Sequence, residues 1–134
     1  MKDPRYPESL ELQLEAITAV DLALYAAASG DLNPLHLDAD VARAAGFERP
    51  IAQGMRTMAC AGRLFTERFG PAALRALNTR FTGSARLGDV LVFRATLTEI
   101  DGDIASYALA GSTASGAAVL SGSARVSLPA APAA

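Results

Sequence analysis

Residues 51–69 read IAQGMRTMACAGRLFTERF and predict one long amphipathic helix. Apolar and small residues recur there every three or four positions, which is the spacing of the buried face of an α-helix. Pro50 suits the first turn of such a helix, and Gly70-Pro71 end it. The positions expected on the buried stripe are Ile51, Met55, Met58, Gly62, Phe65 and Phe69.

The chain after this helix predicts β-strands, because apolar residues alternate there with polar ones. The expected strands are 74–82, 90–100, 104–110 and 117–128. Asp101-Gly102 and Ser115-Gly116 are typical of tight turns between the last three of them. Since short connections join antiparallel neighbours, we expect one antiparallel sheet.

The chain before the helix predicts one more strand and two short helices. Residues 10–16 alternate Leu or Ala with Glu or Gln, as a half-buried strand does. Thr18 is the expected cap of a helix that runs through residue 28. Asp38 is the expected cap of a second helix that ends near residue 46.

Together these elements predict an α+β fold in which an antiparallel β-sheet wraps around one long central α-helix. All the half-apolar strands need an apolar partner, and the long helix offers the one large apolar face. A length of 134 residues without an internal repeat fits a single domain, 1–134. Residues 1–9 are expected to form a loose polar arm, and residues 129–134 a flexible tail.

Charge and cysteine content restrict the class of protein. Twelve basic and fourteen acidic side chains give a net charge of −2 without a block of one sign, so no nucleic-acid or membrane partner is expected. No apolar run has the length of a membrane span, and residues 1–5 lack a signal-peptide core, which predicts a cytoplasmic protein. Cys60 is the single cysteine and is expected to be buried on the long helix. With one histidine and one cysteine, we expect no metal site and no other cofactor.

The run 29–36, Ser-Gly-Asp-Leu-Asn-Pro-Leu-His, contains the only histidine of the chain. His36 follows Asp31 by five positions, and Asn33-Pro34 between them favours a turn. An acid and an imidazole on one stiff, irregular segment form a candidate general acid–base pair. Taken alone, a single histidine in a small protein is more often a satisfied polar group than a catalyst.

The whole run, with Tyr25 ahead of it and Asp38 after it, resembles the signature of the MaoC-like, (R)-specific enoyl-thioester hydratases. The resemblance covers about residues 10–128 and implies a single hot-dog fold. It also implies a hydro-lyase that interconverts (3R)-hydroxyacyl and trans-2-enoyl thioesters of coenzyme A or acyl carrier protein. Such chemistry serves fatty-acid, polyketide or polyhydroxyalkanoate metabolism.

The resemblance also implies roles for individual residues. Asp31 and His36 are the expected catalytic residues: they hold one water between them, Asp31 removes its proton, and the pair returns a proton to C2. Asn33 is expected to orient the loop or His36 rather than to react. The other substrate-binding candidates are Ser29, Gln53, Gly54 and Met55.

Gly54 is the candidate oxyanion donor, because attack at C3 builds negative charge on the thioester carbonyl. In the first turn of a helix the backbone N–H groups are unpaired and the dipole is positive, and glycine lets a substrate approach closely. The other interpretation is that Gly54 only eases packing of the helix on the sheet. Met55 belongs either to the core or to the lining of an acyl tunnel.

Gln53 departs from the family, whose members usually have a histidine at this position. If that histidine serves structure or substrate positioning, glutamine can replace its hydrogen bond. If it titrates during turnover, activity here would be reduced or redirected. Gln53 is thus the one argument for a non-catalytic subunit of a hot-dog dehydratase heterodimer.

Two further expectations concern class and assembly. A hot-dog thioesterase is the less favoured alternative. Such an enzyme usually needs an acidic residue on the long helix facing the site, and Glu67 lies too close to the helix end for this role. A single hot dog leaves an exposed sheet edge and an open substrate groove. We therefore expect a homodimer, or a heterodimer with another hot-dog subunit, in which part of each site comes from across the interface.

Overall fold

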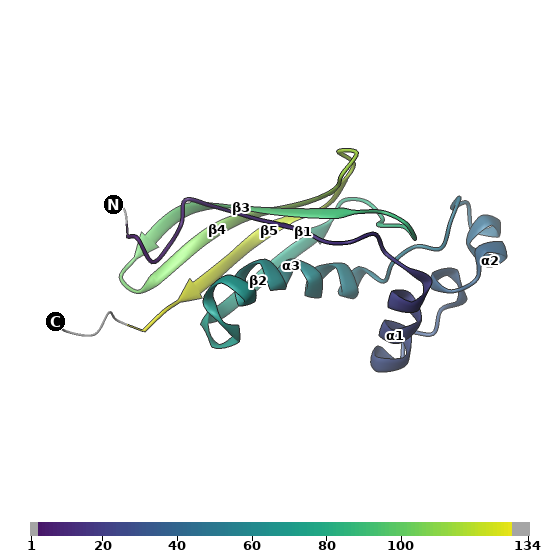
Figure 1. Cartoon of the computed structure of the whole chain (residues 1–134), viewed down its shortest axis with the longest axis horizontal. Coiled ribbons are helices and arrows are strands. Elements are labelled where there is room, and N and C mark those ends of the chain that lie inside the picture. The colour runs from purple at the N-terminus through teal and green to yellow at the C-terminus, as the bar shows by residue number, and fades with distance from the viewer. Residues whose placement is uncertain (1–2, 130–134) are drawn as a thin grey trace.

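The long helix α3 lies across one face of a five-stranded antiparallel sheet (Figure 1). The structure is a computed structural model and describes residues 3–129. The helices are α1 (Ala19–Ser29), α2 (Ala39–Ala44) and α3 (Gly54–Phe69), with single 3₁₀ turns at Pro34–His36 and Pro71–Ala73. The strands are β1 (Ser9–Gln13), β2 (Leu74–Phe81), β3 (Leu91–Asp101), β4 (Ile104–Thr113) and β5 (Ala118–Ser127).

The strands follow the order β1-β3-β4-β5-β2 across the sheet, and each pair is antiparallel. β3, β4 and β5 are joined by two hairpins, while β2 and β1 add to the outer sides of β5 and β3. Within the described chain, β1 and β2 are therefore the two edges. This arrangement confirms the predicted α+β architecture, a sheet wrapped around one long helix.

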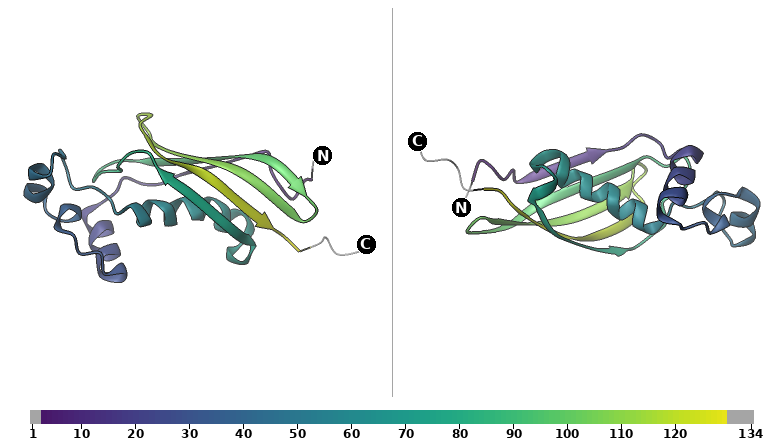
Figure 2. Two further views of the ribbon diagram at one scale, coloured as in Figure 1. Left: turned by 180° about the vertical axis from the view of Figure 1, so that it is seen from behind. Right: turned by 90° about the horizontal axis from the view of Figure 1, so that it is seen from below.

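The core lies between α3 and the sheet face that curves around it (Figure 2). Phe65 of α3 is fully buried, and its ring centre lies 5.8 Å from that of Tyr107 on β4. Ala61 and Gly62 are also buried, and such small residues let the helix approach the sheet closely. Strand residues of this core include Leu91, Phe93, Leu109, Val119, Leu120 and Val126.

The long helix begins three residues later than predicted. Ile51 forms an antiparallel bridge with Arg86, and the N–H of Ala52 donates to the carbonyl of Ala85 at 2.8 Å. These sheet-like contacts keep residues 50–52 extended, so Pro50 does not start the helix. The predicted stripe holds for Gly62 and Phe65, but Met55 is exposed, which excludes its core interpretation.

The ends of the other elements confirm some predictions and correct others. Thr18 caps α1 and Asp38 caps α2, as predicted. β1 ends at Gln13 rather than at residue 16. The turn between β3 and β4 is Gly102-Asp103 instead of Asp101-Gly102, since Asp101 still pairs with Ile104. Gly102 has a φ of 61°, which glycine adopts without strain.

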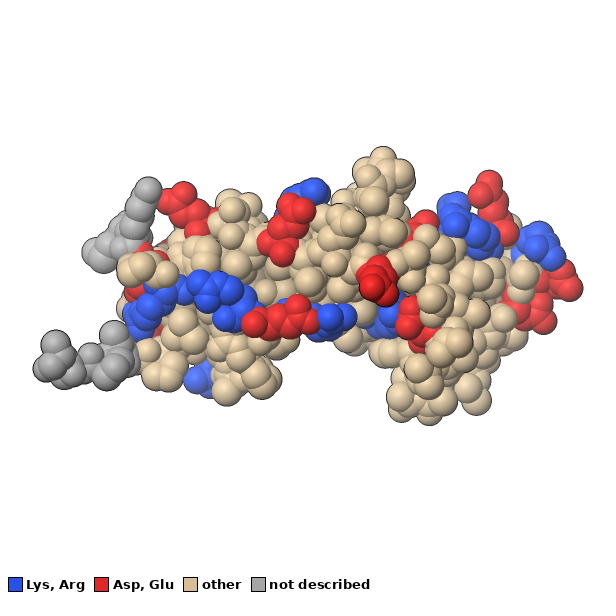
Figure 3. All heavy atoms as spheres, in the orientation of Figure 1, with Lys and Arg blue, Asp and Glu red and all other residues tan. Residues whose placement is uncertain are grey.

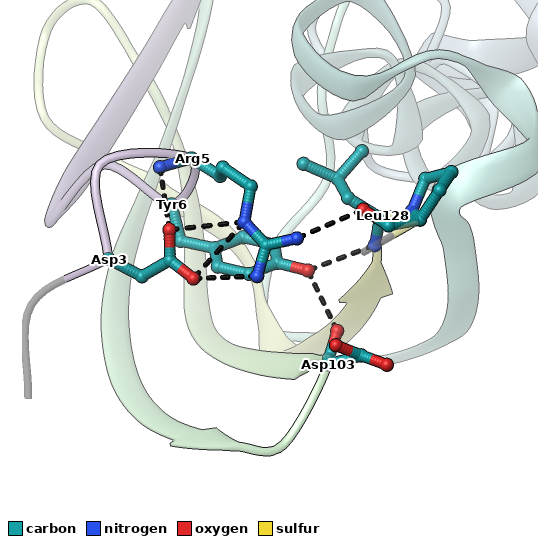
Figure 4. Close-up of polar contacts among 6 residues, drawn as sticks. Asp3, Arg5, Tyr6, Asp103 and Leu128 are labelled. Carbon is teal, nitrogen blue, oxygen red and sulfur yellow. Dashed lines mark hydrogen bonds and ion pairs between the residues drawn. The ribbon is translucent and has the colours of Figure 1, made fainter. Parts of the chain in front are cut away.

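The N-terminal segment packs against the sheet, so the prediction of a loose arm is wrong for residues 3–8. Tyr6 is buried; its hydroxyl donates to the carbonyl of Asp103 at 2.7 Å and accepts from the N–H of Leu128 at 2.9 Å (Figure 4). Arg5 pairs with Asp3 and donates to the carbonyl of Pro129. Residues 1–2 and 130–134, with most of the predicted tail, lie outside the described residues.

The connection from β1 to α3 carries α1 and α2 beyond one end of the sheet (Figures 1 and 2). Acidic and basic side chains are interspersed over the face drawn in Figure 3. None of the helices within residues 3–129 is long and apolar enough to cross a membrane.

Candidate active site

The loop between α1 and α2 begins with a change of chain direction at Gly30. Gly30 ends α1 in the left-handed conformation, with a φ of 78°, and its N–H donates to the carbonyl of Ala26 at 2.9 Å. The N–H of Asp31 then donates to the hydroxyl of Ser29 at 3.1 Å. Asp31 is therefore fixed directly to the end of α1, and Ser29 acts on the loop backbone.

Asn33 organises the second half of the loop. Its side-chain oxygen accepts from the N–H of Leu35 at 3.1 Å and so caps the 3₁₀ turn Pro34–His36. Pro34 occupies the first position of that turn, where its fixed φ is tolerated. The turn carries His36 at its end, and the Asn33 side chain is engaged within the loop.

The loop brings Asp31 and His36 into direct contact. Nε2 of His36 lies 3.3 Å from Oδ2 of Asp31. The histidine side chain is 10% exposed, whereas the aspartate side chain is 46% exposed. The imidazole is thus largely sheltered, and the carboxylate beside it faces solvent.

The other ring nitrogen of His36 fixes the tautomer. Nδ1 lies 2.7 Å from the carbonyl oxygen of Ile51. A carbonyl only accepts hydrogen bonds, so Nδ1 carries the proton. In the neutral imidazole, Nε2 then has a free lone pair on the side of Asp31, and in the charged ring it donates to the carboxylate. The pair can therefore exchange a proton with a group bound beside it.

α3 begins just after Ile51, the residue whose carbonyl binds His36. Gly54 is the first residue of α3, three positions after Ile51, and no side chain within residues 3–129 caps this helix. The first-turn N–H groups have no intrahelical partner and lie at the positive end of the helix dipole. A Cβ on Gly54 would lie 3.3 Å from the ring of Phe81 on β2. The uncapped start of α3 thus follows closely on the carbonyl that binds His36, and the Phe81 ring packs beside it.

The side chains of Gln53 and Met55, two of the substrate-binding candidates, differ sharply in burial. Gln53 is 1% exposed, and its Nε2 donates to the carbonyl of Leu22 in α1 at 3.0 Å. Its side chain is therefore not placed to touch a substrate. Met55 is 59% exposed, so a tunnel lining stays a prediction that needs a covering partner.

Three contributors to this site were not predicted as such: the carbonyl of Ile51, the carbonyl of Leu22 and the ring of Phe81. The first two are backbone groups, which leave no signal in residue identity. Phe81 is exposed at the end of edge strand β2, and neither property can be read from the sequence, because both depend on the order of strands in the sheet.

Metal-ligating side chains do not gather anywhere in the described part of the chain. Across residues 3–129, no group of three or more His, Cys, Asp or Glu residues could hold a metal ion. Cys60 is buried on α3, as predicted.

Comparison with known proteins assigns the family. Residues 6–116 match the family described as MaoC like domain. The chain belongs to this family. A curated relative, named probable enoyl-CoA hydratase 2 of Dictyostelium discoideum, is 36% identical over 90 residues, which are 65% of this chain and 30% of that protein. The 3-hydroxyacyl-thioester dehydratase Y of Mycobacterium tuberculosis is 34% identical over 93 residues, 66% of this chain and 32% of its own length.

This MaoC-like chain thus spans less than a third of the length of each of these curated relatives. A solved structure of similar size gives a fuller match. The (R)-hydratase from A. caviae involved in PHA biosynthesis is 31% identical, with a TM-score of 0.79 over 90% of this chain and 94% of that chain. The hot-dog fold is confirmed by this likeness and by the sheet and helix described above.

Proposed function

We propose that this MaoC-like protein is a hydro-lyase that reversibly hydrates trans-2-enoyl thioesters to (3R)-hydroxyacyl thioesters. The 3.3 Å contact between Nε2 of His36 and Oδ2 of Asp31 carries the proposal. The carbonyl of Ile51 fixes the tautomer in which Nε2 can accept or deliver a proton. The names of the A. caviae and Dictyostelium relatives support the same chemistry.

The proposed step uses one water bound beside the pair. At 3.3 Å, Nε2 and Oδ2 leave no space for a water on the line between them, so the water lies on their solvent side and contacts both atoms. Asp31 takes a proton as the water oxygen bonds to C3. The π electrons of C2=C3 move towards the carbonyl, and the pair returns a proton to C2. Dehydration follows the same path in reverse.

The developing charge on the thioester oxygen needs a donor that is already in position. The N–H of Gly54 serves this purpose in the proposal, because it lies at the uncapped start of α3. Phe81 limits the space above Gly54 and so sets how the acyl group can enter. Coenzyme A and acyl carrier protein both present such a thioester, and the substrate class is proposed at that level.

We also infer that the site is completed by a second hot-dog subunit, in the simplest case another copy of this chain. β2 is an edge strand, and an unpaired edge favours pairing with another chain. Phe81 at the end of this strand is 48% exposed, and Met55 and Leu32 near the site are also exposed. A partner paired along β2 would cover this apolar surface and convert the open site into a tunnel.

The two alternative functions receive less support. Glu67, the acid needed for a thioesterase, pairs with Arg63 in the last turns of α3. Gly54 is thirteen residues earlier, which along a helix is about 20 Å. A non-catalytic subunit rests on Gln53 alone, and the contact between Asp31 and His36 argues against it.

Product analysis with crotonyl-CoA tests the proposed function. We expect 3-hydroxybutyryl-CoA to form without release of free coenzyme A, and the (3R) but not the (3S) isomer to be dehydrated in the reverse direction. Release of free thiol would support a thioesterase instead. Absence of both reactions, with crotonyl-CoA and with a crotonyl carrier protein, would favour the non-catalytic subunit.

A further inference from the structure

Gln53 is a buried polar side chain that the proposed reaction does not use. It is 1% exposed and precedes Gly54 at the start of α3. Its amide nitrogen donates to the carbonyl of Leu22 at 3.0 Å. Leu22 lies inside α1, where the carbonyl also serves the hydrogen bonds of the helix itself. The Gln53 side chain therefore links the start of α3 to the middle of α1.

Stability alone does not explain an amide at this position. Within residues 3–129, Oε1 of Gln53 is buried and has no hydrogen-bond partner. A buried acceptor that lacks a partner lowers stability, and an apolar side chain of the same length would avoid this cost. What the amide adds over an apolar side chain is the hydrogen bond from its Nε2–H to the carbonyl of Leu22 in α1.

The contacts of the site form a closed ring that passes through Gln53. α1 ends at Ser29, whose hydroxyl binds the N–H of Asp31. Asp31 contacts His36, and His36 binds the carbonyl of Ile51. Ile51 is two residues before Gln53, whose side chain returns to α1. The distance between Asp31 and His36 thus depends on where α1 lies relative to residues 51–53.

We propose that Gln53 is a positioning residue that holds α1, and with it Asp31, at the distance from His36 that proton transfer requires. The proposal deepens the hydratase function and rests on it. Because the amide does not titrate, it keeps this link at every pH at which the protein is folded.

A second polar contact between α3 and α1 is longer than a hydrogen bond. Arg56 of α3 approaches Asp21 of α1, but the closest atoms are 3.9 Å apart, which is beyond hydrogen-bond length. α3 lies across the face of the sheet, whereas α1 lies beyond one end of it (Figure 2). Leu22 and Ala26 of α1 are buried, so apolar packing keeps α1 folded when the amide is removed. The amide then determines the precision of the placement rather than the presence of the helix.

The test compares Gln53→Met with Thr57→Val. Thr57 is a matched control because it is also buried in the first turns of α3, and its hydroxyl donates to the carbonyl of Gln53, with no hydrogen bond to α1 among residues 3–129. For Gln53→Met we expect kcat with crotonyl-CoA to fall about tenfold to a hundredfold, the cost of misplacing a catalytic group by a fraction of an ångström to 1 Å. KM and the thermal midpoint are expected to change little. Thr57→Val should keep the wild-type kcat.

Conservative rescue and spectroscopy separate positioning from a general structural role. Gln53→His retains a ring N–H that can reach Leu22, and we expect it to recover most of the lost kcat. His36 is the only histidine, so its imidazole signals are unambiguous in NMR spectra. In Gln53→Met these signals should shift at constant pH in the same direction as in Asp31→Asn, and amides of α1 should exchange faster with solvent.

The outcomes distinguish this proposal from the proposed function. An inactive wild-type protein would remove the hydratase function, yet the NMR and exchange measurements would still show whether Gln53 holds α1. Gln53→Met with wild-type kcat, unchanged His36 signals and unchanged exchange in α1 would overturn the positioning role. Equal losses of kcat and thermal midpoint in Gln53→Met and Thr57→Val would also overturn it.

Discussion

The ring of Phe81 on β2 packs tightly against Gly54 at the start of α3. A Cβ at residue 54 would lie 3.3 Å from two carbons of that ring, closer than most such contacts. Gly62, eight residues further along α3, has ordinary space, since its Cβ would lie 3.6 Å from Leu77. We therefore predict that alanine substitution lowers activity at Gly54 but not at Gly62.

Gly54→Ala should lower kcat/KM for crotonyl-CoA by about a hundredfold, because the methyl group displaces either Phe81 or the substrate. The effect on stability should be small, since the better helix propensity of alanine offsets the crowding against Phe81. The double variant that combines Gly54→Ala with Phe81→Leu should regain part of the activity, because the smaller side chain leaves more space beside residue 54. Gly62→Ala is the control and should keep full activity; a fully active Gly54→Ala would exclude the close approach of substrate.

Phe81→Arg should separate the proposed dimer, because it places a charge on the apolar end of edge strand β2. Sedimentation velocity should show a lighter species, with activity lost in parallel. Ile104→Arg is the matched control: Ile104 is similarly exposed, at the hairpin between β3 and β4. A dimer that survives Phe81→Arg would place the interface on another surface.

Asp21 should make the protein more stable above about pH 4 than below it. The backbone N–H of Thr18 donates to the Asp21 carboxylate at 2.9 Å and holds the pKa of that carboxyl below its usual 3.8. The folded protein therefore favours the charged form, and this contribution disappears as the pH falls through the lowered pKa. Since the carboxylate is partly exposed, its contribution at pH 7 is about 0.5 kcal/mol.

Urea unfolding of wild type and Asp21→Asn measures this contribution. The difference in unfolding free energy should be present at pH 7 and should shrink as the pH approaches 3. A difference that is the same at both pH values would contradict the role of the charge in the capping box.

Tyr107 should weaken the fold at alkaline pH. Burial raises the pKa of its phenol from 10.0 to about 12, and its hydroxyl donates to the carbonyl of Pro7 at 2.8 Å. The folded state favours the protonated phenol, so the stabilisation is complete below pH 10 and is lost as the pH rises towards 12. Tyr107→Phe should unfold more easily than wild type at pH 8. The two unfolding free energies should converge by pH 12, and parallel curves would contradict this account.

Periodicity and capping residues predicted most of the fold. The alternation in 90–100 and the caps Thr18 and Asp38 each act locally, so the sequence contains the whole signal. The predicted start of α3 was three residues too early, because Ile51 and Ala52 pair with residues 86 and 85, far away in the chain. A tertiary contact of this kind overrides the preference of Pro50 for a first helical turn.

The candidate site was predictable where one loop carries it. Asp31, Asn33 and His36 lie within six residues, and the Asn-Pro turn brings the acid close to the imidazole. The position of Gln53 was not predictable, since its partner is a backbone carbonyl 31 residues away. The packing of residues 3–8 was not predictable for a similar reason: the partners of Tyr6, Asp103 and Leu128, come from the other end of the chain.

The most direct measurement of the central claim is the loss of enoyl-thioester absorbance from crotonyl-CoA, compared between wild type, Asp31→Asn and Asp40→Asn. Asp40 is an exposed aspartate on α2 that pairs with Arg43, so its variant controls for the change of charge. We predict turnover by wild type and Asp40→Asn, and a rate at least about a hundredfold lower for a folded Asp31→Asn. Turnover by Asp31→Asn at the wild-type rate would contradict the assignment of Asp31 and His36 as the catalytic pair.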